Sequence, residues 1–156
     1  MKRRLSILIS LLLSLLLISC SAVDIYIDDL LGQGLNDTDL IEIDKDGYYT
    51  SKEDVALYIH TYNKLPNNFI NKKEAMDLGW NPSKGNLWDV TDGMSIGGDR
   101  FGNREGLLPD GRQYYECDIN YKGEYRGAER LVYSDDGTIY YTADHYKSFI
   151  LLYGDD

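Results

Sequence analysis

The sequence is poor in cysteine and proline, and its acidic residues outnumber its basic ones. The 156 residues include only Cys20 and Cys117, and if Cys20 is lipidated, Cys117 stands alone and the fold relies on its own hydrophobic core without a disulfide framework. Three prolines and fourteen tyrosines indicate a strand-rich part, because tyrosine suits a half-buried pleated surface. With 16 basic and 26 acidic residues the formal net charge is −10, which argues against a non-specific binder of polyanions.

Long apolar runs are absent except at the N-terminus, where Lys2 to Arg4 precede an apolar run from Leu5 to Ile18. This pattern predicts an export signal, and the run is short for a membrane span. It ends in Leu-Ile-Ser-Cys20, which is similar to a bacterial lipobox. We therefore predict a signal peptide over residues 1–19, lipidation of Cys20 as the only membrane attachment, and an extracellular or cell-surface location. Ordinary cleavage nearby, which would release the protein, is the alternative.

Residues 20–47 are predicted to form an acidic linker or pro-segment. From Asp24 to Asp46 there are eight acidic residues and only Lys45 as a base, and like charges at this density keep a segment extended. The ligand positions of a calcium-loop template are occupied by Glu42, Asp44, Asp46, Gly47, Thr50 and Glu53. A turn followed by a helix cap explains the same residues, so a calcium-binding surface module is only an alternative, and we predict no metal and no cofactor.

Residues 48–156 are predicted to form one α+β domain. Thr50 and Ser51 are candidate N-caps of a first helix that Pro66 closes, and Asn71 can cap a second helix that ends at Gly79. Alternating patterns then predict strands over residues 114–121, 126–132, 138–142 and 148–153, with a hairpin turn at residues 135–137. Helices followed by such strands favour N-terminal helices packed on an antiparallel β-sheet.

Charged residues alternate on two of the predicted strands. Glu116 and Asp118 share one face of a strand, and Arg126 and Arg130 share a face of the next. If these faces coincide, they form either a structural salt-bridge network or an anion site, where arginines clamp a phosphate and a carboxylate takes a proton. His145 follows the third strand. It is either a surface residue or, if it approaches Glu116, the other half of an acid–base pair that works near neutral pH.

A glycine-rich strand and loop are predicted from Ser95 to Gly106. This segment lacks the lysine and hydroxyl pair of a Walker phosphate loop but suits a base-binding loop, because Gly102 and Asn103 tolerate unusual dihedrals and expose amides. A carboxylate such as Glu105 can accept both N–H donors on the Watson–Crick edge of guanine, where adenine presents an acceptor. A surface β-turn with a salt bridge is the alternative.

Taken together, these residues resemble the barnase family of secreted, guanyl-preferring bacterial ribonucleases. The likeness covers the chain from about Tyr58 to Tyr146, and its specificity comes from many segments in the same order. The segments are Tyr62 to Ile70, Lys72, Glu74 and Ala75, Leu78 to Trp80, Ser83 to Leu87, Asp89 and Val90, Ser95 to Asp99, Asn103 to Gly106, Leu108 and Pro109, Asp118 to Tyr121, Arg126, Arg130, and Asp144 to Tyr146.

The resemblance implies a barnase-like fold and a metal-independent cleavage of RNA through a 2′,3′-cyclic phosphate. Glu116 matches the general base and His145 the general acid of the family. The phosphate-binding cations match Lys72, Arg126 and Arg130, with Asp118 as the buried partner that fixes the arginines. The guanine loop matches Phe101, Gly102, Asn103, Arg104 and Glu105, and Tyr146 would line the site.

The implied partners are a single-stranded RNA substrate and an acidic inhibitor of the barstar type, and nothing in the sequence demands more than a monomer. Three features depart from the family. Gly102 stands where serine is expected, Trp88 stands where a small residue is expected, and residues 47–156 hold 18 acids and 12 bases where killing or digesting members are basic. The alternative function is therefore a catalytically inactive surface lipoprotein that binds a nucleotide or a protein partner with the same fold.

Overall fold

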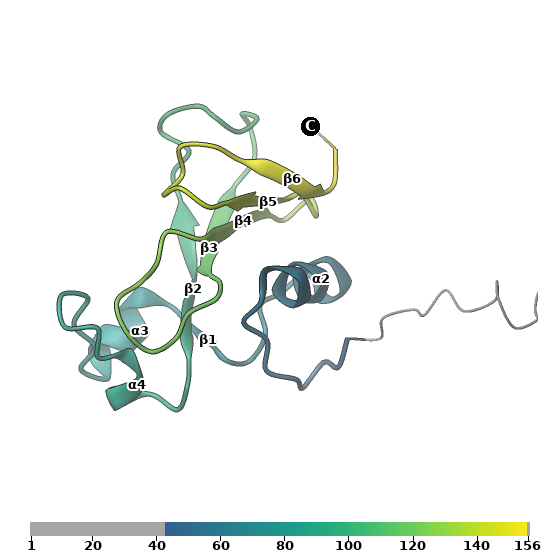
Figure 1. The fold of residues 1–156 in the computed structure, drawn as a ribbon. Helices are drawn as coiled ribbons and strands as arrows, with labels where there is room; N and C mark the ends of the chain where they lie inside the picture. The colour runs from purple at the N-terminus through teal and green to yellow at the C-terminus, as the bar shows by residue number, and fades with distance from the viewer. Residues whose placement is uncertain (1–42, 156) are drawn as a thin grey trace, which may run out of the picture. The chain divides into compact units, whose positions relative to one another are not determined.

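The computed structural model describes residues 43–155 (Figure 1). The predicted signal peptide (residues 1–19), Cys20 and most of the acidic segment lie outside the described residues. Within the described part of the chain, no helix is long and apolar enough to cross a membrane.

Within residues 43–155, helices α2 (Lys52–Tyr62) and α3 (Lys72–Asp77) form where local signals predict them. Helix α2 begins after Ser51, whose Oγ accepts a hydrogen bond from the Asp54 backbone N–H at 3.1 Å. Helix α3 begins with a complete capping box at Asn71, and helix α4 (Leu87–Val90) is a single turn. The sequence therefore predicted α2 and α3 in place.

Six strands follow one another in chain order across a single sheet. They are β1 (Phe69–Ile70), β2 (Ser95–Phe101), β3 (Tyr114–Asp118), β4 (Arg130–Ser134), β5 (Ile139–Thr142) and β6 (Ile150–Tyr153). All neighbours pair antiparallel except β1 and β2, which are parallel. The α+β prediction is confirmed. The parallel strand was missed, since two residues are too few to show an alternating pattern.

The placement of Arg126 on a strand is wrong. Strand β4 begins only at Arg130, and Arg126 lies in the connection from β3 to β4. In contrast, Arg130 pairs directly with Asp118 across the antiparallel ladder, so these two side chains do share a face. The alternation before Arg130 has the period of a strand, but its residues have no partner in the sheet.

The two faces of the sheet are covered differently. Helix α2 packs on one face, where Val55 and Ile59 meet Cys117 and Leu131 in a buried cluster (Figure 1). On the other face, Val132 packs in a second cluster with Leu108 from the β2–β3 connection, and Tyr146 and Phe149 from the β5–β6 connection pack against this cluster. Successive side chains of β3 point to opposite faces of the sheet, so Glu116 and Asp118 both point to this second face. Loops, and not a helix, cover that face.

Contacts of the domain extend back to Ile43, which precedes the predicted start at Tyr48. Ile43 is 5% exposed, and its carbonyl accepts a hydrogen bond of 2.6 Å from the Tyr62 hydroxyl. Asp44 forms a turn in which its carbonyl accepts from the Gly47 backbone N–H at 3.2 Å. The described part of the calcium template is thus a turn followed by the start of a helix. In residues 43–155, no group of three or more His, Cys, Asp or Glu side chains is placed to hold a metal ion.

Candidate active site

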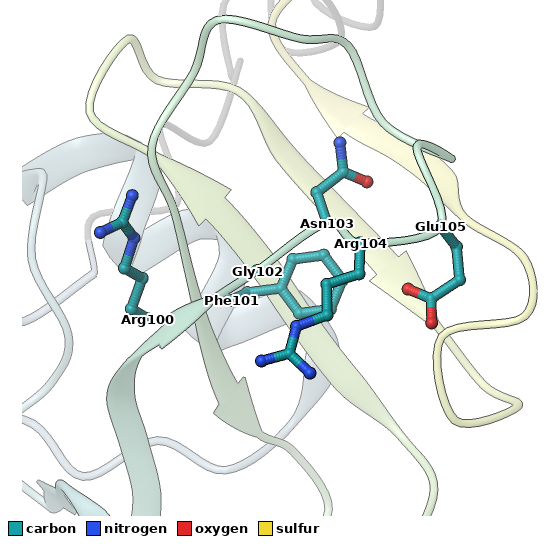
Figure 2. A pocket seen from close by; sticks show the side chains of 6 residues that line it. All are labelled: Arg100, Phe101, Gly102, Asn103, Arg104 and Glu105. Atoms are coloured by element: carbon teal, nitrogen blue, oxygen red, sulfur yellow. The ribbon is translucent and has the colours of Figure 1, made fainter.

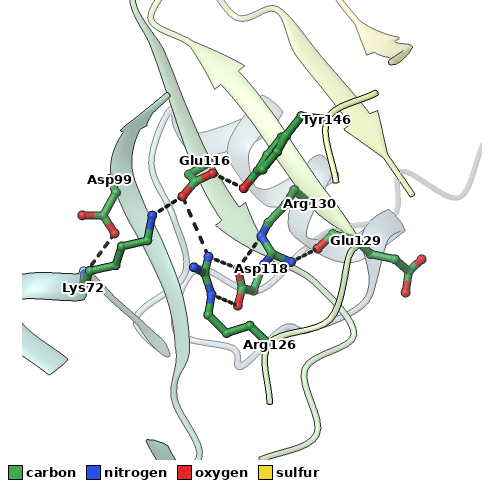
Figure 3. A network of polar contacts seen from close by, with 8 residues as sticks. All are labelled: Lys72, Asp99, Glu116, Asp118, Arg126, Glu129, Arg130 and Tyr146. Carbon is green, nitrogen blue, oxygen red and sulfur yellow. Dashed lines mark hydrogen bonds and ion pairs between the residues drawn. The ribbon is translucent and has the colours of Figure 1, made fainter. Parts of the chain in front are cut away.

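Glu116 lies at the centre of a polar network on the loop-covered face of the sheet (Figure 3). Its side chain is 8% exposed. One carboxylate oxygen, Oε1, accepts a hydrogen bond from Lys72 Nζ, and the other, Oε2, accepts one from the Tyr146 hydroxyl. Arg126 Nη2 lies 3.8 Å from Oε1. Burial alone would raise the pKa of Glu116, but these hydrogen bonds and positive charges outweigh it and hold the pKa below 4.5.

Lys72 reaches Glu116 from the first residue of α3. Its backbone N–H donates to Asp99 Oδ2 at 3.0 Å, which ties the start of the helix to β2. Asp99 lies where the β2–β3 register shifts, so a bulge next to the site turns this side chain toward α3. No sequence pattern indicates this contact, because a bulge is a property of the paired strands.

Asp118 is almost completely buried between two guanidiniums. Arg126 makes a bidentate contact, with Nε at 2.7 Å from Oδ2 and Nη2 at 2.6 Å from Oδ1. Arg130 Nε lies 2.8 Å from Oδ1, and its Nη1 donates to the Glu129 carbonyl at 2.7 Å. Arg126 is the more accessible arginine, with 21% of its side chain exposed against 4% for Arg130. The carboxylate thus holds one guanidinium inside the protein and the other at its surface.

His145 lies in a tight turn after β5. His145 and Tyr146 have φ angles of +55° and +65°, in the left-handed region that non-glycine residues rarely adopt. Asp144 stabilises this turn: its Oδ1 accepts the backbone N–H groups of Lys147 and Ser148, both at 3.0 Å, and its Oδ2 accepts the Ser148 hydroxyl at 2.7 Å. These donors lower the pKa of Asp144 to about 2. The strained turn keeps His145 exposed and directs Tyr146 to Glu116.

The glycine-rich loop begins at the end of β2. Asn103 has φ of +40°, and its side chain closes the loop, with Nδ2 donating to the Leu108 carbonyl at 2.8 Å and Oδ1 accepting from the Leu108 N–H at 3.1 Å. A hollow of about 330 Å³ is lined by Arg100, Phe101, Gly102, Asn103, Arg104 and Glu105 (Figure 2). The Phe101 ring packs on Tyr146 at 5.1 Å between centroids, which places the loop beside the Glu116 network.

The structure brings together six of the predicted site residues, in contact around two carboxylates. They are Lys72, Glu116, Asp118, Arg126, Arg130 and Tyr146. The guanine loop adjoins this group through Phe101. His145 is next to Tyr146 in the chain, and its side chain is exposed. Two residues that shape the site were missed, Asp99 and Asp144. The sequence pattern that could have indicated the role of Asp144 is Ser148 four residues later, since an Asp and a Ser at this spacing can close a turn.

The arrangement can bind an anion and move a proton. Lys72 and Arg126 present cationic groups at the edge of the network, and both are partly exposed. A phosphate placed there would meet two positive charges beside a carboxylate that is ionised at neutral pH.

Comparison with known proteins gives the family. A family model described as ribonuclease matches residues 52–153. A ribonuclease of Heyndrickxia coagulans is 56% identical over 97 residues, which cover 61% of this chain and 89% of that protein. A ribonuclease of Bacillus intermedius is 56% identical over 97 residues, covering 61% of this chain and 60% of that protein. Guanyl-specific ribonuclease St of Saccharopolyspora erythraea is 48% identical over 54 residues, 33% of this chain and 54% of that protein.

Fold, site and similarity define the class of protein as an RNA-cleaving enzyme, an endoribonuclease. Within this class, the chain belongs to the ribonuclease family matched over residues 52–153, whose barnase-type microbial members it resembles in sequence and fold. The resemblance stated from the sequence is thereby confirmed.

Proposed function

We propose that this enzyme is a guanyl-preferring ribonuclease that cleaves single-stranded RNA with Glu116 as general base and His145 as general acid. The observation that carries the proposal is the environment of Glu116. The carboxylate is buried, accepts hydrogen bonds from Lys72 and Tyr146, and lies next to the Arg126 guanidinium. A carboxylate held ionised beside phosphate-binding cations can take a proton where a phosphate sits.

In the first step, Glu116 removes the proton of the 2′-hydroxyl, and the 2′-oxygen attacks the adjacent phosphorus. The bond from phosphorus to the 5′-oxygen breaks, and His145 gives a proton to that leaving oxygen. The product is a 2′,3′-cyclic phosphate. In the second step a water molecule opens this ring, with His145 accepting the proton of the water and Glu116 returning one to the 2′-oxygen. Acid–base work of this kind contributes about 10² to 10⁴ in rate.

The cations bind the phosphate and stabilise the charge that develops on it. Lys72 and Arg126 are partly exposed and are placed to contact a phosphate. The Arg130 side chain is only 4% exposed, so it would stabilise the phosphate through its positive charge without direct contact. The nucleophile belongs to the substrate itself, so the reaction needs no metal to generate one. DNA lacks the 2′-hydroxyl and is not expected to be cleaved.

The loop from Phe101 to Glu105 is proposed to bind guanine. It lines a hollow next to the network, and Glu105 is exposed at its end. The carboxylate can accept two N–H groups of guanine, and a missing donor at such a site is costly, so adenine would bind worse. The guanyl-specific ribonuclease St among the relatives supports the same preference.

The inactive alternative is not favoured, since every charged group that the proposed reaction uses is present. The excess of acidic residues has a different consequence. Residues 47–156 hold 18 acids and 12 bases, so binding of long RNA would depend on the local cations of the site and weaken with salt.

Location and partners are proposed on the sequence alone. We propose export by the segment 1–19 and a lipid anchor at Cys20, with the enzyme acting at the cell surface as a monomer. An acidic inhibitor of the barstar type would fit the cationic groups around Glu116. Labelling with a radioactive fatty acid in bacteria, with Cys20→Ser as control, tests the anchor: label that persists in the variant would contradict it.

The function is tested with GpA and ApA dinucleotides at low salt in the presence of EDTA. We expect guanosine 2′,3′-cyclic phosphate from GpA and far less cleavage of ApA. Folded Glu116→Ala and His145→Ala proteins should cleave neither dinucleotide. Cleavage that stops with EDTA, or that survives Glu116→Ala, would contradict the proposed mechanism. Equal cleavage of ApA would contradict the guanyl preference alone.

A further inference from the structure

The connection from β3 to β4 carries Arg126 but has no sheet partner to hold it. It spans residues 119–129, between Asp118 and Arg130. Its start is fixed where the Asn120 N–H donates to the Thr50 carbonyl at 2.7 Å, and the Tyr121 hydroxyl bridges to the Glu124 carbonyl at 2.7 Å. Across the base of the loop, Asn120 Nδ2 donates to Glu129 Oε2 at 3.1 Å. The backbone between these two ends, which includes Arg126, is then held by what packs against the tip of the loop.

The side chain of Trp88 packs against that tip. An added Cβ at Gly123 would lie 2.2 Å from Trp88 Cε3 and 2.6 Å from Cδ2, so the indole ring lies directly on the Gly123 backbone. The ring also meets Tyr121 edge-on at 5.7 Å between centroids, and its Nε1–H donates to the Met94 carbonyl at 2.9 Å. The indole is thus fixed by its own hydrogen bond while it holds the loop.

A second contact supports the loop from the same segment. An added Cβ at Gly85 would lie 3.0 Å from the Glu124 carbonyl carbon and 3.1 Å from the Tyr125 backbone nitrogen. The backbone of Gly85 therefore runs against the loop immediately after Gly123. Trp88 nevertheless remains 42% exposed, which is unusual for so large a ring and shows that it covers a surface loop instead of filling the core.

We propose that Trp88 is a positioning residue for Arg126: by holding Gly123, it fixes the loop from which the guanidinium reaches Asp118 and Glu116. The inference rests on the proposed role of Arg126 in phosphate binding. Gly123 is three residues before Arg126, and its φ of +86° together with the ring contact permits only glycine there. A misplacement of about 1 Å at a catalytic group can cost about 100-fold in rate, so a loose loop would reduce catalysis without removing any charge.

The kinetic test combines Trp88→Ala with Arg126→Ala and measures kcat for GpA. We expect roughly a 10- to 100-fold loss of kcat from Trp88→Ala alone, partial recovery in Trp88→Phe, and less than about 3-fold further loss when Trp88→Ala is added to Arg126→Ala. Equal fold-losses in both backgrounds would show that Trp88 acts through general stability and would overturn the proposal. Unfolding curves establish that each variant is folded in the assay.

Glycine substitutions at two positions with nearly the same positive φ provide a matched pair, Gly123 at +86° and Gly137 at +88°. Gly123→Ala places a methyl group into the Trp88 ring and is expected to lower kcat as Trp88→Ala does. Gly137→Ala brings the same kind of backbone strain but meets no atom within 4 Å, and it is expected to leave kcat unchanged. An active Gly123→Ala enzyme, or equal losses from both substitutions, would contradict the role of the contact.

A readout independent of activity separates this proposal from the catalytic one. The Arg126 Nε–H donates to Asp118 Oδ2 at 2.7 Å, so its NMR signal should exchange slowly with water in the unaltered protein and faster in Trp88→Ala. Unchanged exchange in Trp88→Ala would overturn the positioning role. Faster exchange together with a fully active Arg126→Ala enzyme would instead contradict the proposed role of Arg126 and leave its positioning by Trp88 in place.

Discussion

Replacing Tyr146 with phenylalanine tests whether hydrogen bonds to Glu116 set the pH range in which the enzyme works. Burial raises the pKa of Glu116, whereas the bonds from Lys72 and Tyr146 and the charges of Lys72 and Arg126 lower it, with a net value below 4.5. Tyr146→Phe removes one hydrogen bond to a charged acceptor and leaves every positive charge in place. Fewer interactions then counteract the rise in pKa that burial causes, so the pKa of Glu116 should increase.

The size of this rise follows from the strength of the lost bond. A hydrogen bond to a charged group contributes about 1.5–3 kcal/mol, and about 1.4 kcal/mol corresponds to one pH unit. The acid limb of kcat/KM for GpA should therefore move up by about 1–2 pH units in Tyr146→Phe. Lys72→Ala should move the limb in the same direction and also lower the plateau, since it removes a cation that we propose binds the phosphate.

Tyr146→Phe should also lower the free energy of unfolding at neutral pH. The folded-state pKa of Glu116 is lowered, so its ionised form stabilises the protein above its ordinary pKa of 4.5, and this contribution is lost as the pH falls through the folded value. Tyr146→Phe should reduce that contribution.

The control is Tyr133→Phe, because Tyr133 packs on the opposite face of the sheet with Tyr115 and should leave the acid limb in place. An unmoved limb in folded Tyr146→Phe protein would refute the reasoning.

Three further substitutions test other parts of the site. Asp118→Ala leaves two guanidiniums without their buried partner and should lower the free energy of unfolding by about 3–5 kcal/mol; a loss below about 1 kcal/mol in urea titrations would contradict this. Glu105→Gln replaces a proposed acceptor of guanine by a group that also donates, and the preference for GpA over ApA should fall about 10- to 100-fold. Gly102→Ser restores the residue expected from the family, and because an added Cβ meets nothing closer than 3.6 Å, unfolding should change by less than about 0.5 kcal/mol; a larger loss would mean that the loop requires glycine.

Local patterns in the sequence were sufficient for the helices and for most of the strands. Ser51 and Asn71 cap helices through bonds to residues three positions away, so both ends of the contact lie in one short segment. The alternation around Glu116 fixes which side chains share a face of β3, because successive residues of a strand point to opposite sides. The same rule failed for Arg126, where an alternating stretch continues outside the sheet.

The contacts that make the site could not be obtained in this way. Tyr146 meets Glu116 from 30 positions away in the chain, and Lys72 meets it from 44 positions away. The family resemblance named these residues as members of one site, but only the packed structure shows that they hold the same carboxylate and so lower its pKa.

Composition, caps and alternation are properties of neighbouring residues, and the sequence by itself determined the helices, the faces of the strands and the types of residue available for chemistry. Which distant groups meet depends on how helices and loops pack over the sheet. The turn that directs Tyr146 to Glu116, the bulge that brings Asp99 to Lys72, and the contact of Trp88 with Gly123 were therefore decided only by the tertiary structure.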